Sequence, residues 1–201
     1  MNGMHYMRRV ACPARRHASR GVTLVETLAV MGIVAILMAI GIPSYKYVTN
    51  ANRISAEING LLGDLQFARS EAIKEGRTVS VCVSSDQSSC MTVSPATNWN
   101  KGWIVFSDPN GNGAVDAGDL LLRAQATFRG SDTFSANNSI GAITFNREGF
   151  ASVTNGTLIG TLITLHASPA VQGSTRCLSV TLVGLVTTQK YGDVDSGNTC
   201  L

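Results

Sequence analysis

Glu26 is the residue whose position most restricts the chemistry it can do. It is the only charged residue in the apolar run 22–42, and a carboxylate inside a bilayer costs several kcal/mol unless it has a partner or a function. Cleavage after Gly21 would supply a partner, because the new amino group of Val22 would be a cation at the same depth. Pairing of these charges, within a chain or, better, between neighbours, would remove much of this cost, and pairing between neighbours would set the axial register of packed helices. A glutamate that only reaches toward lipid head groups is the alternative.

Four cysteines outside the N-terminal 21 residues could form two disulfides. Cys82, Cys90, Cys177 and Cys200 are an even set, as is usual in an oxidising compartment, and only Cys12 precedes them. Of the three possible connectivities we expect Cys82–Cys90 and Cys177–Cys200, because each pair is close in sequence and encloses a turn-rich stretch. Buried free thiols are the alternative, whereas zinc is disfavoured by the lack of a CxxC pair.

The segment 108–119 has the D-x-N-x-N-G spacing of a calcium loop. Its last position carries the shorter aspartate in place of the usual glutamate, Pro109 is unusual at the second position, and the flanks have the pattern of strands. Hairpin loops use the same residue types, so a purely structural loop is favoured, no cofactor is expected, and calcium stays a secondary hypothesis. The oxygen ligands would come from Asp108, Asn110, Asn112, Asp116 and Asp119.

Nucleic acid is not expected as a partner. Five of the 16 basic residues lie within positions 1–21, so their removal leaves 11 basic against 13 acidic side chains. Arg176 and Lys190 are the only basic residues after Arg147, and binding to a DNA backbone needs several phosphate contacts. These two residues are therefore weak candidates for DNA contacts, and solvated surface charges are the simpler interpretation.

Enzymatic activity is not expected either. His166 is the only histidine after position 21, and it lies in a strand-like run. The sequence has no nucleophile elbow, phosphate loop or pair of metal ligands. The aromatic residues Trp99, Trp103 and Phe106 are expected in the core.

Two successive helical patterns position these residues. The run 22–42 has the length needed to cross a hydrocarbon core of ~30 Å, and the basic residues before it place the N-terminus in the cytoplasm. A helix then continues to about residue 75, where Gly76 is a stop signal. Leu62 and Ile73 should widen its apolar face, which is formed by Ile54, Ile58, Leu61, Leu65, Ala68 and Ala72.

Short runs rich in Val, Ile, Thr and Phe follow, separated by Gly, Asn, Pro and Ser. They predict strands and, with the helix, an α+β fold with a mainly antiparallel sheet. The expected strands are 78–83, 102–107, 120–127, 142–146, 158–166, 176–182 and 185–189.

The N-terminal pattern resembles the processing signal of type IV pilins and type II secretion pseudopilins. Arg20-Gly21-Val22-Thr23-Leu24-Val25-Glu26 has the basic leader, the glycine before the cut and the glutamate at the fifth mature position. Pro43 matches the helix-bending proline of these proteins. The segments 65–74 (LQFARSEAIK) and 103–108 (WIVFSD) resemble the GspH/FimT group of minor pilins and pseudopilins.

The resemblance implies a type IV pilin fold and cleavage by a prepilin peptidase that also methylates the new N-terminus. It implies a single-pass inner-membrane protein with a periplasmic head, which then joins a filament with major and minor pilins, often near the tip. The expected division is a leader (1–21), a helix (22–75, with 22–42 in the membrane or filament core and 43–75 amphipathic) and a β-rich head (76–201). A type IV pilus subunit, a type II secretion pseudopilin and a DNA-binding pilin remain open, although the C-terminal G-R-x-R motif of DNA-binding relatives is missing.

Overall fold

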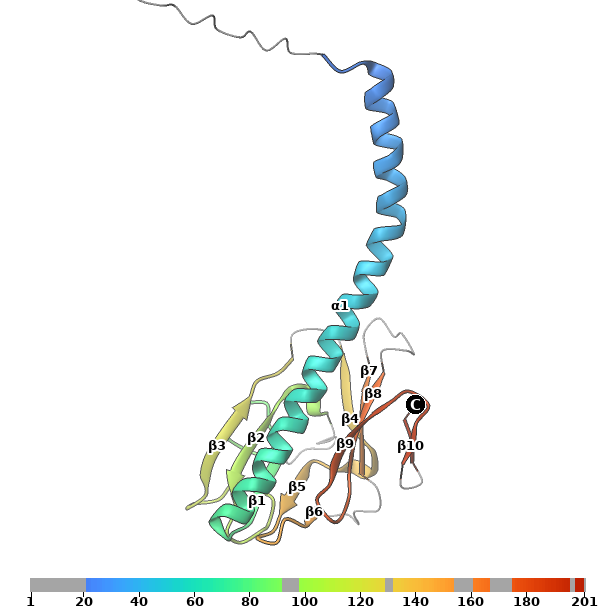
Figure 1. Cartoon of the computed structure of the whole chain (residues 1–201). Coiled ribbons are helices and arrows are strands. Elements are labelled where there is room, and N and C mark those ends of the chain that lie inside the picture. The colour runs from blue at the N-terminus through green and yellow to red at the C-terminus, as the bar shows by residue number, and fades with distance from the viewer. Residues whose placement is uncertain are drawn as a thin grey trace, which may run out of the picture. The chain divides into compact units, whose positions relative to one another are not determined.

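The computed structural model describes residues 21–91, 98–128, 132–153, 161–166, 175–195 and 198–200 (Figure 1). Most of the expected leader and Cys12 lie outside the described residues. By its internal contacts the chain divides into one unit that ends at Ser44 and a second that begins at Tyr45. Each unit is described by itself.

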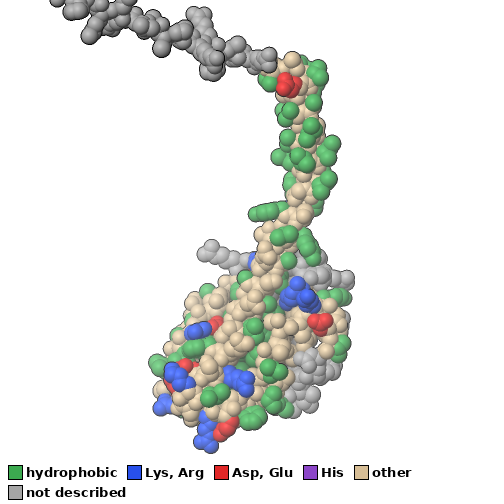
Figure 2. All heavy atoms as spheres, viewed as in Figure 1, with side chains coloured by type: hydrophobic (Ala, Val, Ile, Leu, Met, Phe, Trp, Pro, Cys, Tyr) green, Lys and Arg blue, Asp and Glu red, His purple; other side chains and the backbone are tan. Residues whose placement is uncertain are grey.

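The described part of the first unit consists of residues 21–23 and the beginning of the helix α1 (Leu24–Glu75). Its large apolar side chains are exposed from Val22 to Ile42, and Figure 2 shows hydrophobic groups along this stretch. The stretch is long and apolar enough to cross a membrane. Pro43 lies inside the helix, where the missing N–H removes one bond of the helical ladder.

In the second unit, α1 buries one apolar face along its length. The six residues of the expected stripe, from Ile54 to Ala72, are all buried, so the helical periodicity is confirmed. The helix ends at Glu75 and is followed by Gly76, whose φ is 66°, and the N–H of Arg77 donates to the carbonyl of Ala72. This hydrogen bond gives a partner to a backbone carbonyl in the last turn of the helix. It requires a left-handed backbone at residue 76, which glycine adopts readily.

Ile73 departs from the expected stripe, because 51% of it is exposed. Its Cδ1 lies close to the turn at Gly149, where a Cβ would be 2.8 Å away. The side chain therefore packs against the end of a hairpin and leaves its other side open.

The first sheet has five strands in the order β3-β2-β1-β5-β6, all antiparallel. The bounds are β1 (Val79–Val83), β2 (Trp103–Ser107), β3 (Leu120–Gln125), β5 (Ala142–Phe145) and β6 (Ala151–Val153). A register shift occurs in the pairing of β2 with β3, between Val105 and Phe106. The 3₁₀ turn η1 (Trp99–Lys101) precedes β2, and η2 (Asn137–Ser139) precedes β5.

The second sheet has four antiparallel strands in the order β4-β7-β8-β9, and a two-stranded ladder joins β10 to β11. The bounds are β4 (Thr133–Ala136), β7 (Thr161–His166), β8 (Arg176–Val180), β9 (Val186–Lys190), β10 (Val194–Asp195) and β11 (Asn198–Thr199). The expected α+β class is thus confirmed, with the β-structure divided between separate sheets.

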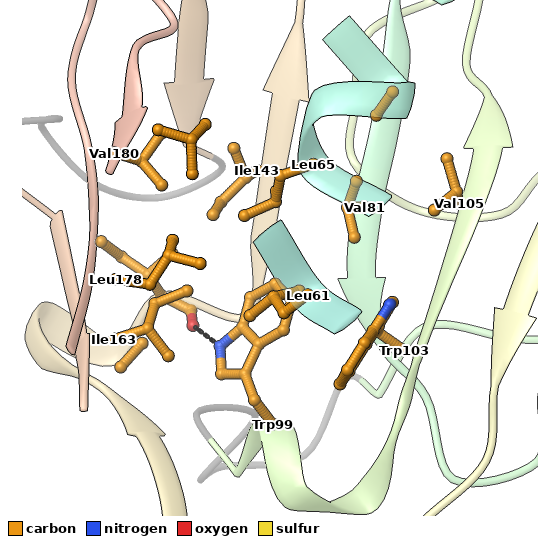
Figure 3. Packing of buried hydrophobic residues seen from close by; sticks show 14 of the residues in the cluster. Leu61, Leu65, Val81, Trp99, Trp103, Val105, Ile143, Ile163, Leu178 and Val180 are labelled. Atoms are coloured by element: carbon orange, nitrogen blue, oxygen red, sulfur yellow. Dashed lines mark hydrogen bonds between the residues drawn. The ribbon is translucent and has the colours of Figure 1, made fainter. Parts of the chain in front are cut away.

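One hydrophobic core joins α1 to both large sheets. Figure 3 shows the helix residues Leu61 and Leu65 between side chains of the two sheets. The indole of Trp99 is fully buried and donates from Nε1 to the carbonyl of Ile140 at 3.1 Å. Trp103 and Phe106 are also buried, which confirms that these aromatic residues serve packing.

Candidate functional site

The N-terminal segment presents the expected processing residues on an exposed stretch. Gly21 and Val22 precede the helix and are exposed. The side chain of Thr23 accepts a hydrogen bond from the backbone N–H of Glu26 at 3.2 Å, so Thr23 caps the helix. Glu26 therefore lies in the first turn, where the helix dipole favours a negative charge.

This cap was missed in the sequence, although a signal for it is present. Thr23 and Glu26 form the T-x-x-E spacing of a capping box. The bond seen in the structure uses the backbone N–H of Glu26 and not its carboxylate, whose expected role stays in assembly.

Both expected disulfides are present in the structure. Cys82 of β1 is bonded to Cys90, and Cys177 of β8 is bonded to Cys200. Cys82 is buried with Ile104 on the face of the first sheet that lies opposite the main core. The two bonds thus fasten the 84–90 loop to one sheet and the C-terminal segment to the other.

The segment 108–119 connects β2 to β3 and is organised around Asp108. This side chain is fully buried, and its carboxylate accepts hydrogen bonds from four donors at 2.6–3.2 Å. The donors are Ser80 Oγ and the backbone N–H groups of Gly111, Asn112 and Gly113. Hydrogen bonds from protein groups therefore occupy the acceptor sites of the carboxylate that would be the first ligand of a calcium ion.

The other candidate ligands of this loop also bond to one another. The Asn110 and Asn112 amides both donate to Oδ2 of Asp116. These hydrogen bonds lower the pKa of Asp116, and the bond from Asn110 has the larger effect. The backbone N–H of Asp116 donates to the carboxylate of Asp119 at 2.8 Å. Within the described ranges, no group of three or more His, Cys, Asp or Glu side chains is arranged to hold a metal ion.

The two weak candidates for DNA contacts lie directly opposite each other. Arg176 begins β8 and is paired with Lys190 at the end of β9. Lys190 is exposed, whereas Arg176 is half-buried and donates to the carbonyl of Thr175. The structure thus brings the two cations together on one cross-strand pair. The backbone of His166 is at the end of β7, and its side chain lies outside the described residues.

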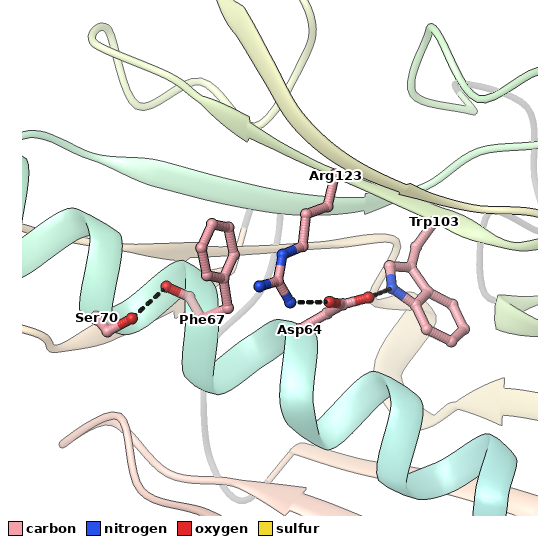
Figure 4. A network of polar contacts seen from close by, with 5 residues as sticks. All are labelled: Asp64, Phe67, Ser70, Trp103 and Arg123. Carbon is pink, nitrogen blue, oxygen red and sulfur yellow. Dashed lines mark hydrogen bonds and ion pairs between the residues drawn. The ribbon is translucent and has the colours of Figure 1, made fainter.

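A polar network that the sequence did not reveal ties α1 to the first sheet (Figure 4). Asp64 accepts from Trp103 Nε1 at 2.8 Å and from Arg123 at 3.0 Å. The guanidinium of Arg123 also stacks 3.6 Å from the ring centroid of Phe67. One carboxylate of the helix thereby fixes β2 and β3.

A second network joins α1 to the segment before β4. Arg53 donates twice to Asp132, at 2.7 and 2.8 Å, and the side chain of Asp132 is only 1% exposed. Glu57 follows one turn later, and its Oε2 is buried without a hydrogen-bond partner among the described residues. The pKa of Glu57 is raised to about 7, chiefly by burial and also by the charge of Asp132, while the charge of Arg53 opposes the shift.

The family models match two parts of this chain. Residues 57–184, well over half of the chain, match the family model described as "Type II transport protein GspH". The chain belongs to the GspH family. Residues 16–42 match the prokaryotic N-terminal methylation motif, and this range includes Gly21, Val22 and Glu26. Both matches confirm the resemblance to the GspH/FimT group that the sequence suggested.

Solved structures similar to this GspH-family protein include two crystal forms of the type IV minor pilin FimU of Pseudomonas aeruginosa (strain PAO1). The form in space group P65 is 20% identical with a TM-score of 0.45, and the match covers 76% of this chain and 98% of FimU. The form in space group P21 is 19% identical with a TM-score of 0.47, and the match covers 79% and 98%. No curated protein sequence matches the chain. At these levels of similarity the FimU structures carry no function over to this protein.

Proposed function

We propose that this GspH-family protein is a minor pilin, incorporated into a type IV pilus at or near the tip, where it supports assembly. The observation that carries the proposal is an N-terminal methylation motif over residues 16–42, whose apolar stretch 22–42 is exposed and holds one carboxylate, that of Glu26. Its role is structural rather than enzymatic. A head with two disulfides and a continuous core suits a subunit exposed outside the cytoplasm.

In this proposal a prepilin peptidase cleaves after Gly21, so the leader is 1–21, the helix 22–75 and the head 76–201. The precursor crosses the inner membrane once, with the head in the periplasm. The amino group of Val22 then pairs with Glu26, its own or that of a neighbour, because an unpaired carboxylate inside the apolar bundle is costly. The partners are the major pilin and other minor pilins.

A type II secretion pseudopilin is the second candidate, since the matching family model is described as a type II transport protein. The same processing and helix packing apply to it, and only the partners differ. DNA binding has less support, because the described residues offer a single cross-strand pair of cations in the C-terminal third.

Co-purification from native cells tests the proposal. The full-length chain, tagged at its C-terminus and expressed at its native level, is extracted after crosslinking, and its partners are identified by mass spectrometry. Pilus subunits among the partners support the minor pilin, and secretion-system subunits support the pseudopilin. Recovery as an isolated monomeric membrane protein contradicts both.

A further inference from the structure

A groove of about 310 Å³ lies between α1 and the turn that joins β8 to β9. Its walls come from Gln66, Arg69, Ser70 and Ile73 of the helix, from Gly184 and Leu185 of the turn, and from Val186 of β9. All of these residues belong to the second unit of the chain. The groove is large enough for one or two side chains of another polypeptide.

Large apolar side chains are exposed around this groove. Ile73, Leu185, Leu182 and Val183 are between 51% and 56% exposed, and so is Phe150 of the neighbouring turn at 51%. The two turns are in contact, because the N–H of Ala151 donates to the carbonyl of Leu182. A contiguous apolar area on a protein surface is typical of an interaction site.

Arg69 is held in a fixed position at this groove. Its Nε donates to the carbonyl of Gly149 at 3.0 Å and its Nη2 to that of Val183 at 3.1 Å. Gly149 and Gly184 both have positive φ, and a Cβ on either would approach Nε of Arg69 to 3.0 Å. The two turns are thus fitted closely around one guanidinium.

Arg69 forms no ion pair within the described part of the chain. The four described ion pairs join other residues, and Arg69 is the one charged residue among those that line the groove. A guanidinium has five N–H donors, and the two carbonyl bonds use two of them. The preferred additional partner is a carboxylate.

We propose that this groove binds an apolar segment that carries a carboxylate, supplied by a neighbouring pilin-type subunit. The apolar side chains of the segment would pack against Ile73 and Leu185, and its carboxylate would pair with Arg69. The two carbonyl bonds of Arg69 explain how the turns are held, but they do not account for the exposed apolar residues around them. The inference rests on the proposed function for the identity of the partner as a filament subunit.

Site-specific photocrosslinking in native cells tests this inference. A photoreactive residue replaces Leu182 in the full-length chain, and the crosslinked peptide is identified by mass spectrometry. A matched control carries the same photoreactive residue at Leu120, which is 62% exposed. Leu120 belongs to β3, the edge strand of the first sheet opposite to β6, and β6 is the strand that contacts Leu182. We expect the Leu182 position, and not the control, to capture an apolar, acid-containing peptide of another filament subunit.

Two substitutions at Leu185 separate the charge from the apolar contact. Leu185→Asp places a carboxylate of the chain itself beside Arg69, so it should compete with the partner and lower the crosslink yield about tenfold. Leu185→Asn introduces a side chain of the same size as aspartate but without its charge, so it should lower the crosslink yield less than Leu185→Asp does. Equal yields for the two variants, or adducts from Leu182 only with lipid or with a second copy of this chain, would overturn the inference.

The result also distinguishes this inference from the proposed function. If the crosslink is missing while the chain still co-purifies with filament subunits, the groove assignment fails and the minor-pilin proposal stands. If the chain co-purifies with no such subunits, both fail.

Discussion

Asp64 shows how one side chain can hold several elements together. Its carboxylate accepts hydrogen bonds from Trp103 of β2 and Arg123 of β3, and its side chain is only 16% exposed. Replacement by alanine would leave the buried indole N–H without a partner. We expect Asp64→Ala to destabilise the fold by about 1–3 kcal/mol, measured by denaturant unfolding of the full-length chain in detergent.

The matched control for this prediction is Asp64→Asn, which keeps an acceptor for Trp103 and loses the charge opposite Arg123. Because Arg123 is about half exposed, the ion pair itself contributes little, and the asparagine variant should lose less stability than the alanine variant. Equal losses would show that the indole bond is not the important one.

Glu57 predicts a specific dependence of stability on pH. Its pKa is raised from 4.5 to about 7, chiefly by burial, so the folded chain binds this proton more tightly than the unfolded chain does. The resulting stabilisation is complete below about pH 4.5 and is lost as the pH rises through about 7. Glu57→Gln should remove this part of the pH dependence, as followed by thermal unfolding from about pH 4.5 to 8.

The control is Glu75→Gln, at the exposed end of the same helix, which should behave as the unmodified chain. A Glu57→Gln variant that loses stability over this pH range as steeply as the unmodified chain would contradict the assignment.

Asp108 predicts that the 108–119 loop does not depend on calcium for stability. Because four protein donors already saturate its carboxylate, neither millimolar calcium nor a chelator should shift the melting temperature. Asp108→Asn should lower it, since an amide cannot accept all four bonds. A rise in the melting temperature on addition of calcium would restore the metal hypothesis.

Sequence analysis could identify residues that belong to short motifs or closely spaced pairs, and it missed residues whose contacts are distant in the sequence. Gly21, Val22 and Glu26 form a short motif, and Cys82 and Cys90 are separated by 8 positions. Asp64 meets partners 39 and 59 positions away, and no spacing in the chain indicates which carboxylate will face Trp103.

At the scale of elements, the long helix and the apolar strands were predictable because their periodicity repeats over many residues. All seven expected strands are present, and where their ends are described they differ by at most a few residues. Positions 158–160 of the expected strand 158–166 lie outside the described residues. The short strands β4, β6, β10 and β11 were missed. β6 has only three residues, too few for an alternating pattern, and the TFSA sequence of β4 is equally typical of a loop.

The Cys177–Cys200 bond joins the C-terminal segment to a central strand of the second sheet, so it should stabilise that sheet. The bond spans 23 positions, and closing a loop of this length contributes roughly 3 kcal/mol in the chain-entropy estimate. The Cys177→Ser, Cys200→Ser double variant should therefore unfold at lower denaturant concentration.

The comparison for this prediction is the Cys82→Ser, Cys90→Ser double variant, whose bond spans 8 positions and should contribute somewhat less. An unchanged unfolding midpoint in the first double variant would show that the sheet does not depend on its bond.

At the scale of the whole molecule, the two units differ in what they expose. The first presents an apolar helix with no cover of its own among the described residues, whereas the second has a continuous core between α1 and two sheets. An exposed apolar helix of this length is stable only in a membrane or against other helices. In the proposed function the precursor places this helix in the membrane, and after cleavage the pairing of Val22 with Glu26 allows the helix to pack against other helices in the filament.

The most direct test of this account is the mass of the N-terminal peptide of the chain purified from native cells. We predict that the chain begins at Val22 with a methylated amino group, and that Gly21→Leu leaves the leader in place. A native chain that still begins at Met1, or one that is cut beyond residue 42 so that the apolar helix is lost, would contradict the account.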